Sequence, residues 1–247
     1  MESFGFDFID DLASRCRESL PLEETLTDAG PYRALTRADG DASAGWIRRW
    51  STPDSALIDR MIHIRLQADP VDTQLFFLFG RSPTAMPHFH AQVVQFAPDA
   101  CVYNTDFLAR LDPVEHPDYF AQVFAPLSKP YWRAINDQQN KCALAPANPA
   151  IAAYLTPWSI GVGQPTDRAE LDRVTPQIHA FLDHYLDLTR SLDYPIQDAD
   201  AQTARDRAHL DSFFSDRLDR RAWNGVYGLI GEEAGRNLKD VLKTPLS

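Results

Sequence analysis

The sequence predicts an α+β fold in which helices pack on the faces of an antiparallel sheet. From Trp46 to Asp106, apolar and polar side chains alternate with period two in runs that short turns separate. Short connections favour antiparallel neighbours, because parallel strands need a long crossover. From residue 117 onward, the apolar residues recur mostly with helical spacing. A block of strands followed by a block of helices is typical of α+β proteins. A chain of 247 residues without a Gly/Ser-rich linker favours one domain over residues 1–247.

The strands are expected in chain order across this region. Alternation and turn signals predict strands over 46–50, 58–67, 74–80, 87–94 and 100–106, and a later short strand over 158–162. The third strand contains the unbroken apolar run Leu75–Phe79, which predicts a strand covered on both faces.

Helical spacing marks the two ends of the chain. Pro21 closes an amphipathic helix over about the first 20 residues, with Phe4, Phe8 and Leu12 near one face. Residues 25–45 have the composition of a loop. Further helices are expected over 117–124, 167–192, 201–214 and 220–242.

Charge and cysteine content restrict the class of protein. The net charge of −11 argues against nucleic acid and anionic membranes as partners. No apolar run approaches the ~18–20 residues that span a bilayer, and the N-terminus does not have the pattern of a signal peptide. Cys16, Cys101 and Cys142 form no CxxC pair, so we expect reduced thiols in a soluble, cytoplasmic protein.

One polar stripe stands out on the predicted strand 87–94. Side chains alternate between the faces of a strand, so His88, His90 and Gln92 point the same way. Imidazoles titrate near neutral pH, and this pattern fits proton transfer or hydrogen bonding to a polar ligand. Two other interpretations remain open: histidines satisfied by protein partners, and a metal site, for which a third ligand at matching spacing is not evident.

Other charged residues allow both a structural and a functional interpretation. His63 and Arg65 share a face of the preceding strand, either as a solvated surface or as a cationic wall for a carboxylate. Asp216 fits a helix cap, and Asp206 fits a helix-surface ion pair. The sequence has no GxGxxG, GxxxxGK, GxSxG or HExxH motif, so electrons for any redox chemistry are expected from another protein.

Several segments together resemble one known superfamily. These are the stretch Pro87–Gln95, the following strand to Asp106, the sequence His116-Pro117-Asp118-Tyr119, and the segment Leu229–Ala234. They are similar to the ferredoxin-dependent bilin reductases, and most closely to the red chlorophyll catabolite reductase branch. The resemblance implies a single bilin-reductase-like domain, a three-layer α/β/α sandwich with a central antiparallel sheet. It implies an open-chain tetrapyrrole between the sheet and the C-terminal helices.

The resemblance also implies a reaction and a set of site residues. Family members bind no metal or flavin, take single electrons from ferredoxin, and pass through substrate radicals with protons from side chains. The family's sheet carboxylate aligns with Gln92, and its neighbouring glutamate aligns with Arg65, two departures from the pattern. The helix-side aspartate aligns with Asp216 or Asp206, and we expect His88 or His90 to replace the missing acid. The expected proton-transfer residues are His88, His90, Asp216 and Asp206, and the expected tetrapyrrole contacts are Gln92, Arg65, His63 and Asp106.

Three functional hypotheses follow. The first is an oxidoreductase acting on CH–CH groups of a linear tetrapyrrole, either a biliverdin-like bilin or a chlorophyll catabolite, with reduced ferredoxin as electron donor and no bound cofactor. Acidic ferredoxin needs a local basic surface, for which the candidates are Arg217, Arg220, Arg221, Arg236, Lys239 and Lys243. The second is a non-catalytic tetrapyrrole-binding protein on the same fold. The third is a metal-dependent β-sheet enzyme that uses the His88/His90 pair.

Overall fold

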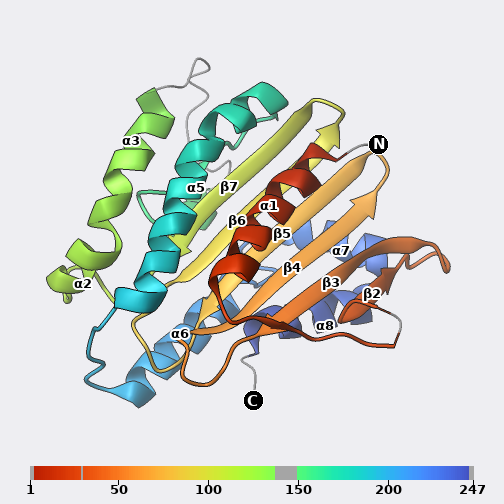
Figure 1. The fold of residues 1–247 in the computed structure, drawn as a ribbon. Helices are drawn as coiled ribbons and strands as arrows, with labels where there is room; N and C mark the ends of the chain where they lie inside the picture. Colours follow the sequence, from red (N-terminus) through yellow and green to blue (C-terminus); the bar gives the residue numbers. More distant parts are fainter. Residues whose placement is uncertain (1–2, 29, 137–148, 245–247) are drawn as a thin grey trace.

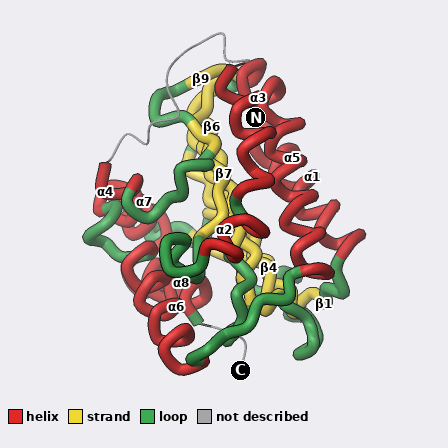
Figure 2. The backbone as a smooth tube through the Cα atoms, turned by 90° about the vertical axis from the view of Figure 1, so that its left-hand side faces the viewer, coloured by secondary structure: helices red, strands yellow, loops and turns green. Residues whose placement is uncertain are grey.

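The computed structural model is a three-layer α/β/α sandwich, which confirms the predicted α+β class with an antiparallel sheet. It describes residues 3–28, 30–136 and 149–244. An edge-on view separates the layers, with the sheet between two groups of helices (Figure 2). The strands are β1 (Glu23–Glu24), β2 (Arg33–Thr36), β3 (Ser43–Ser51), β4 (Ile58–Ala68), β5 (Val71–Gly80), β6 (His88–Ala97), β7 (Ala100–Leu108), β8 (Ile160–Gly161) and β9 (Thr166–Asp167).

Every strand pair is antiparallel, and the central part of the sheet follows the chain. The order is β1-β3-β4-β5-β6-β7-β8, with β2 added on β3 and β9 on β7. The four long strands β4 to β7 therefore form the meander that the short connections predict.

Helices from different parts of the chain cover the two faces. On one face lie α1 (Phe4–Ser19), α2 (Pro117–Val123), a 3-10 turn (Ala125–Leu127), α3 (Ser128–Asn136) and α5 (Arg168–Ser191). The other face is covered by α4 (Pro149–Ala152), α6 (Ala199–Phe213), α7 (Arg220–Ile230) and α8 (Glu232–Lys243). Figure 1 shows α1 and α5 in front of the sheet and α7 and α8 behind it.

The alternation along β5 divides the buried side chains between two cores. Phe76 and Leu78 belong to the core under α1 and α5, whereas Phe77 and Phe79 belong to the core under α6 to α8. The prediction that the run Leu75–Phe79 is covered on both faces is confirmed. Two cores on one sheet explain why this strand has few polar residues.

The structure departs from the predicted elements at several points. The helix expected over 220–242 is two helices, because Gly231 adopts φ 84° between α7 and α8. The loop expected over 25–45 contains β2, which pairs with β3 at the sheet edge. Asp219, and not Asp216, caps α7 by accepting from the N–H of Ala222. The short elements β1, β9 and α4 were not expected, since elements of two to four residues carry too little periodicity to detect, and α3 was not expected either.

Two further expectations concern the cysteines and membranes. Cys16 and Cys101 are buried free thiols, and Cys142 lies outside the described residues. None of the described helices combines the length and apolar character needed to cross a bilayer.

Replacing Gly45 by alanine is expected to destabilise the sheet. Gly45 adopts φ +131°, and a Cβ there would lie 1.9 Å from the carbonyl oxygen of Arg65 on β4. Both the conformation and the clash penalise a side chain, so we expect a loss of at least about 1–3 kcal/mol in unfolding free energy. Urea unfolding measures the loss. The control is Gly40→Ala, where a Cβ meets nothing within 4 Å; equal stability of the two variants would contradict the prediction.

Candidate functional site

The polar stripe of β6 faces the layer formed by α6 to α8. His88 and His90 are 1% and 3% exposed, and their rings pack against Phe79 and Phe77 at centroid distances of 5.3 and 5.9 Å. Phe213, at the end of α6, lies 5.7 Å from the His90 ring. The prediction that the two histidines share a face is confirmed, and that face is an interface between the sheet and the C-terminal helices.

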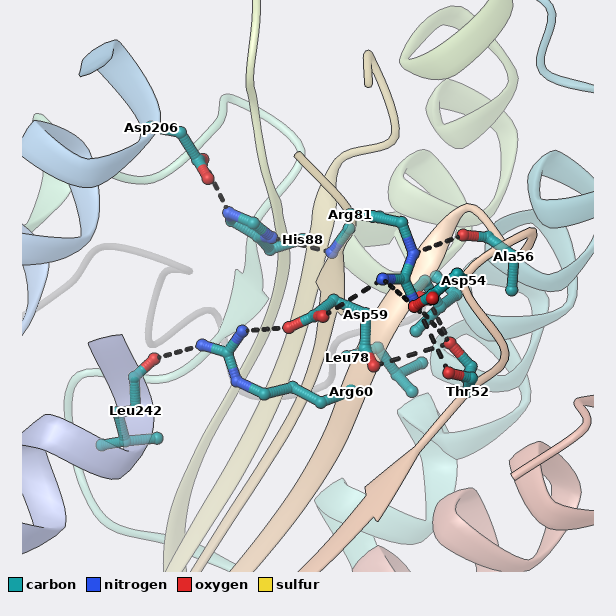
Figure 3. A network of polar contacts seen from close by, with 12 residues as sticks. Thr52, Asp54, Ala56, Asp59, Arg60, Leu78, Arg81, His88, Asp206 and Leu242 are labelled. Carbon is teal, nitrogen blue, oxygen red and sulfur yellow. Dashed lines mark hydrogen bonds and ion pairs between the residues drawn. The ribbon is translucent and has the colours of Figure 1, made fainter. Parts of the chain in front are cut away.

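His88 is the centre of a buried hydrogen-bond chain (Figure 3). Its Nδ1 accepts the backbone N–H of Gly80 at 2.9 Å, so the ring proton lies on Nε2, which donates to Oδ1 of Asp206 at 2.9 Å. Oδ2 of Asp206 accepts from Arg110 at 2.8 Å. Burial lowers the pKa of His88 and outweighs the attraction of Asp206, so the imidazole is neutral.

Asp206 is therefore not the helix-surface residue that its sequence context predicts. It is 8% exposed and points from α6 onto the sheet. Burial alone would raise the pKa of its carboxyl, but His88 and Arg110 together lower it to about 2. The helical period shows which residues share a face of α6, but not that this face carries Asp206 against β6.

Two buried arginines complete the polar interface, and the sequence interpretation missed both. Arg110 donates to two backbone carbonyls in addition to Asp206. Arg60 stacks 3.9 Å above the Phe79 ring and donates to Asp59 and to the carbonyl oxygen of Leu242 at the end of α8. Figure 3 shows Arg60 of β4 contacting Leu242 of α8, and Asp206 of α6 contacting His88 of β6. The sequence did contain a signal for Arg60, because it is a charged residue in the otherwise apolar stripe of β4.

Asp106 lies on β7, the strand next to β6, directly opposite His90. The two residues are register partners, so their side chains emerge side by side on the same face. The Asp106 carboxylate is fully buried and accepts from the backbone N–H of Thr156 at 2.6 Å, the Thr156 hydroxyl at 2.5 Å and the N–H of Phe107 at 2.8 Å.

Burial shifts the pKa values of Asp106 and His90 in opposite directions. Burial raises the pKa of Asp106 to about 7, against the opposing effect of its three hydrogen bonds. Burial lowers the pKa of His90 to about 4, so this imidazole is neutral. Nε2 of His90 is buried and has no hydrogen-bond partner among the described residues. A carboxyl that holds its proton near neutral pH thus lies beside an imidazole with an unused polar atom.

The polar stripe becomes more accessible beyond His90. Gln92 is half-buried and pairs in register with Asn104 on β7, which is also half-buried and donates to Ser159 at 2.7 Å. Leu75 and Val94 on the same face are half-buried as well. This half-buried part of the β6–β7 face adjoins the buried His90–Asp106 pair.

His63 and Arg65 lie on the opposite face of the sheet, which corrects the expectation that they share one ligand wall with the stripe. His63 is fully buried beneath α1, hydrogen-bonds Gln74 at 2.9 Å, and stacks on Phe6 at 6.1 Å. Arg65 forms an ion pair with Asp72 at 2.6 Å. Alternation fixes which residues of one strand share a face, but the pairing register fixes which stripes of neighbouring strands coincide.

Asp216 lies in a different place from the His88–His90 interface. It is exposed and belongs to the lining of a cavity of about 1010 Å³ between the α6–α7 turn, α8 and the short helix α4. Lys239 donates to its carboxylate, and this hydrogen bond lowers the pKa of Asp216. Phe214 lines the same cavity and contacts Phe77, which in turn stacks on His90. Phe214 therefore links the lining of the cavity to the aromatic side chains around His90.

The basic residues predicted to form a surface for ferredoxin fall into two groups. Three of them are paired with acids: Lys239 with Asp216, Arg236 with Glu232, and Lys243 with Asp211. Three others are exposed around the α6–α7 turn: Arg217, Arg220 and Arg221.

The geometry gives no support to the metal-site hypothesis. Both ring nitrogens of His88 already have protein partners, so the His88/His90 pair does not offer two free ligands. In the part of the chain that the structure describes, no group of three or more His, Cys, Asp or Glu side chains is arranged to hold a metal ion.

Fold and site together define an α/β/α sandwich with a buried polar site between an antiparallel sheet and the C-terminal helices. No protein-family model matches the sequence, and no curated protein matches it significantly. Among solved structures, the fold matches phytochromobilin synthase from tomato, crystallised in complex with biliverdin. The TM-score is 0.75 at 13% sequence identity, over 96% of this chain and 82% of that one. The chain therefore has the fold of phytochromobilin synthase, and the resemblance to the red chlorophyll catabolite reductase branch stays a prediction.

Proposed function

We propose that this protein binds a linear tetrapyrrole against the half-buried part of the β6–β7 face and reduces it with electrons from ferredoxin. The observation that carries the proposal is the buried Asp106 beside His90, a carboxylic acid whose raised pKa of about 7 suits proton donation near neutral pH. The likeness to a phytochromobilin synthase that binds biliverdin supports the ligand class at the level of fold.

Each reducing step needs one electron and one proton. Reduced ferredoxin supplies the electron, and the Asp106 O–H bond breaks as a new bond to hydrogen forms on the tetrapyrrole. The carboxylate left behind is held by Thr156 and the N–H of Phe107, while burial favours its reprotonation for the next step. Two such steps saturate one double bond, with no resident metal or flavin.

The other polar side chains have supporting roles in this proposal. Nε2 of His90 is free to hydrogen-bond a lactam oxygen or pyrrole nitrogen, and Gln92 does the same from the half-buried end of the stripe. His88 is engaged with Asp206 and Gly80, so it holds α6 in position and is not the proton donor. Asp106 on β7, the strand next to β6, thus supplies the acid that is missing at Gln92.

An anaerobic assay tests the proposal. Purified protein, biliverdin, ferredoxin and a reducing system should give loss of the biliverdin absorption band and a product of shorter conjugation, dependent on ferredoxin. Absence of any spectral change with biliverdin and with an open-chain chlorophyll catabolite would overturn it. Stoichiometric binding of biliverdin without reduction would instead favour a non-catalytic tetrapyrrole-binding protein. The presence of Gln92 in place of an acid is the observation that favours this alternative.

Replacing His90 by glutamine should alter the bound ligand directly. Loss of the imidazole removes a polar contact beside the reacting part of the ligand, and we expect the reduction rate to fall about 10-fold or more, with a shifted spectrum of bound biliverdin. Stopped-flow absorbance measures both. His179→Gln, on the α5 side of the sheet, is the matched control; equal behaviour of the two variants would count against a ligand contact at His90.

A further inference from the structure

The hairpin of α7 and α8 builds a second polar cluster in the lining of the outer cavity. The hydroxyl oxygen of Tyr227 on α7 accepts a short hydrogen bond from Nζ of Lys239 on α8. The same hydroxyl donates to Oδ1 of Asp216 at 2.9 Å, and Nζ of Lys239 reaches that oxygen at 2.5 Å. All three side chains line the cavity of about 1010 Å³.

The neighbouring residues fix the position of this cluster. A Cβ at Gly235 would lie 2.5 Å from Cδ1 and 2.8 Å from Cε1 of Tyr227, so the absence of a side chain there lets the ring pack on α8. Nζ of Lys239 lies 4.3 Å from the Trp223 ring centroid and 4.9 Å from that of Tyr227. Lys239 is only 8% exposed, which is rare for a lysine and costs desolvation.

This arrangement orients the Tyr227 hydroxyl as a hydrogen-bond donor at the cavity, because its oxygen accepts from Lys239 and its proton is directed at the exposed Asp216. Asp216, the present acceptor of the phenol proton, is exposed at the cavity, so a carbonyl oxygen of a ligand can take its place. The sheet site makes no use of these three residues.

We propose that Tyr227, positioned by Lys239, is a hydrogen-bond donor to a lactam carbonyl oxygen of the ligand in the outer cavity. This inference rests on the proposed function, because a linear tetrapyrrole supplies such oxygens at its two ends.

Biliverdin titration of ferredoxin-free protein tests the inference. Tyr227→Phe removes only the hydroxyl, and we expect its dissociation constant to rise about 10-fold with a blue shift of the bound long-wavelength band. Gly235→Ala displaces the ring without deleting a polar atom and should produce the same change. Tyr131→Phe, in α3 on the other side of the sheet, is the matched control. Thermal unfolding followed by circular dichroism establishes that each variant is folded.

The outcomes separate this inference from the proposed function. Weaker binding and a shifted band in Tyr227→Phe and Gly235→Ala, with Tyr131→Phe unchanged, support it. Biliverdin bound by Tyr227→Phe as by the unmodified protein overturns the inference and leaves the proposed function standing. No binding by the unmodified protein overturns both. If Tyr227→Phe does not fold, an unchanged spectrum and affinity in Gly235→Ala overturns the inference.

Discussion

Asp106→Asn is expected to abolish reduction of the tetrapyrrole while leaving it bound. Asparagine keeps the shape and hydrogen-bonding capacity of the side chain but cannot release a proton, and loss of a general acid typically costs about 10²–10⁴-fold in rate. Single-turnover absorbance with reduced ferredoxin measures the rate, and equilibrium titration measures binding. Asp118→Asn, an exposed residue in the first turn of α2, should leave both unchanged. An Asp106→Asn protein with the original rate would exclude Asp106 as the donor.

The same replacement changes how stability depends on pH. The pKa of Asp106 is about 7 in the fold, against about 3.9 in an unfolded chain. The native state therefore binds the extra proton between these values. Its contribution to stability is full below pH ~4 and is lost as the pH rises through about 7, by up to about 4 kcal/mol. The asparagine side chain cannot titrate, so the Asp106→Asn variant should lose less stability between pH 5 and pH 8. If the unfolding free energies of the wild type and the variant, measured in urea, fell in parallel between pH 5 and pH 8, the raised pKa would be contradicted.

The second large effect is expected at Asp206. Asp206→Asn leaves the buried guanidinium of Arg110 without its counter-charge and weakens the acceptor for His88, and breaking such a buried pair costs about 3–5 kcal/mol. Urea unfolding at pH 7 measures the loss. Asp200→Asn in the exposed first turn of α6 is the control. A loss below about 1 kcal/mol would show that the ion pair does not hold α6 to the sheet.

A double variant shows whether the cost comes from the unpaired charge. Asp206→Leu combined with Arg110→Met replaces the ion pair by apolar groups, a change that is often close to neutral. We expect the double variant to be more stable than the sum of the two single losses predicts. The pKa of Asp206 is about 2 in the fold, so its contribution is present above about pH 4 and is lost as the pH falls through 2. Wild-type stability should therefore decline in acid more steeply than that of the double variant.

Much of the sheet was predictable because strand periodicity is local. Four long strands, their short connections and the helix starting near residue 4 agree with the sequence interpretation within a few residues. The end of α7 at Gly231 and the strands β1 and β9 escaped it, since none of them leaves a repeating pattern, whereas β8 lies within the short strand predicted over 158–162. Of the candidate site, the shared face of His88, His90 and Gln92 was predictable from alternation alone.

The partners of that stripe could not be predicted from local pattern. Asp106 meets His90 only through the register of β6 and β7, and Asp206 meets His88 only because α6 docks across the sheet, 118 residues away along the chain. The raised pKa of Asp106 follows from complete burial, which depends on layers contributed by distant segments. Register also placed His63 and Arg65 under α1, away from the stripe.

The sequence by itself determined the fold class, the central strands and the single polar stripe of β6, because backbone geometry makes side chains alternate wherever a strand forms. Only the tertiary structure decided that His88 is tied to Asp206 and that His90 lies beside a buried acid. Pairing and burial are properties of contacts between segments far apart in the chain, and these contacts set both the partners of a side chain and its affinity for a proton.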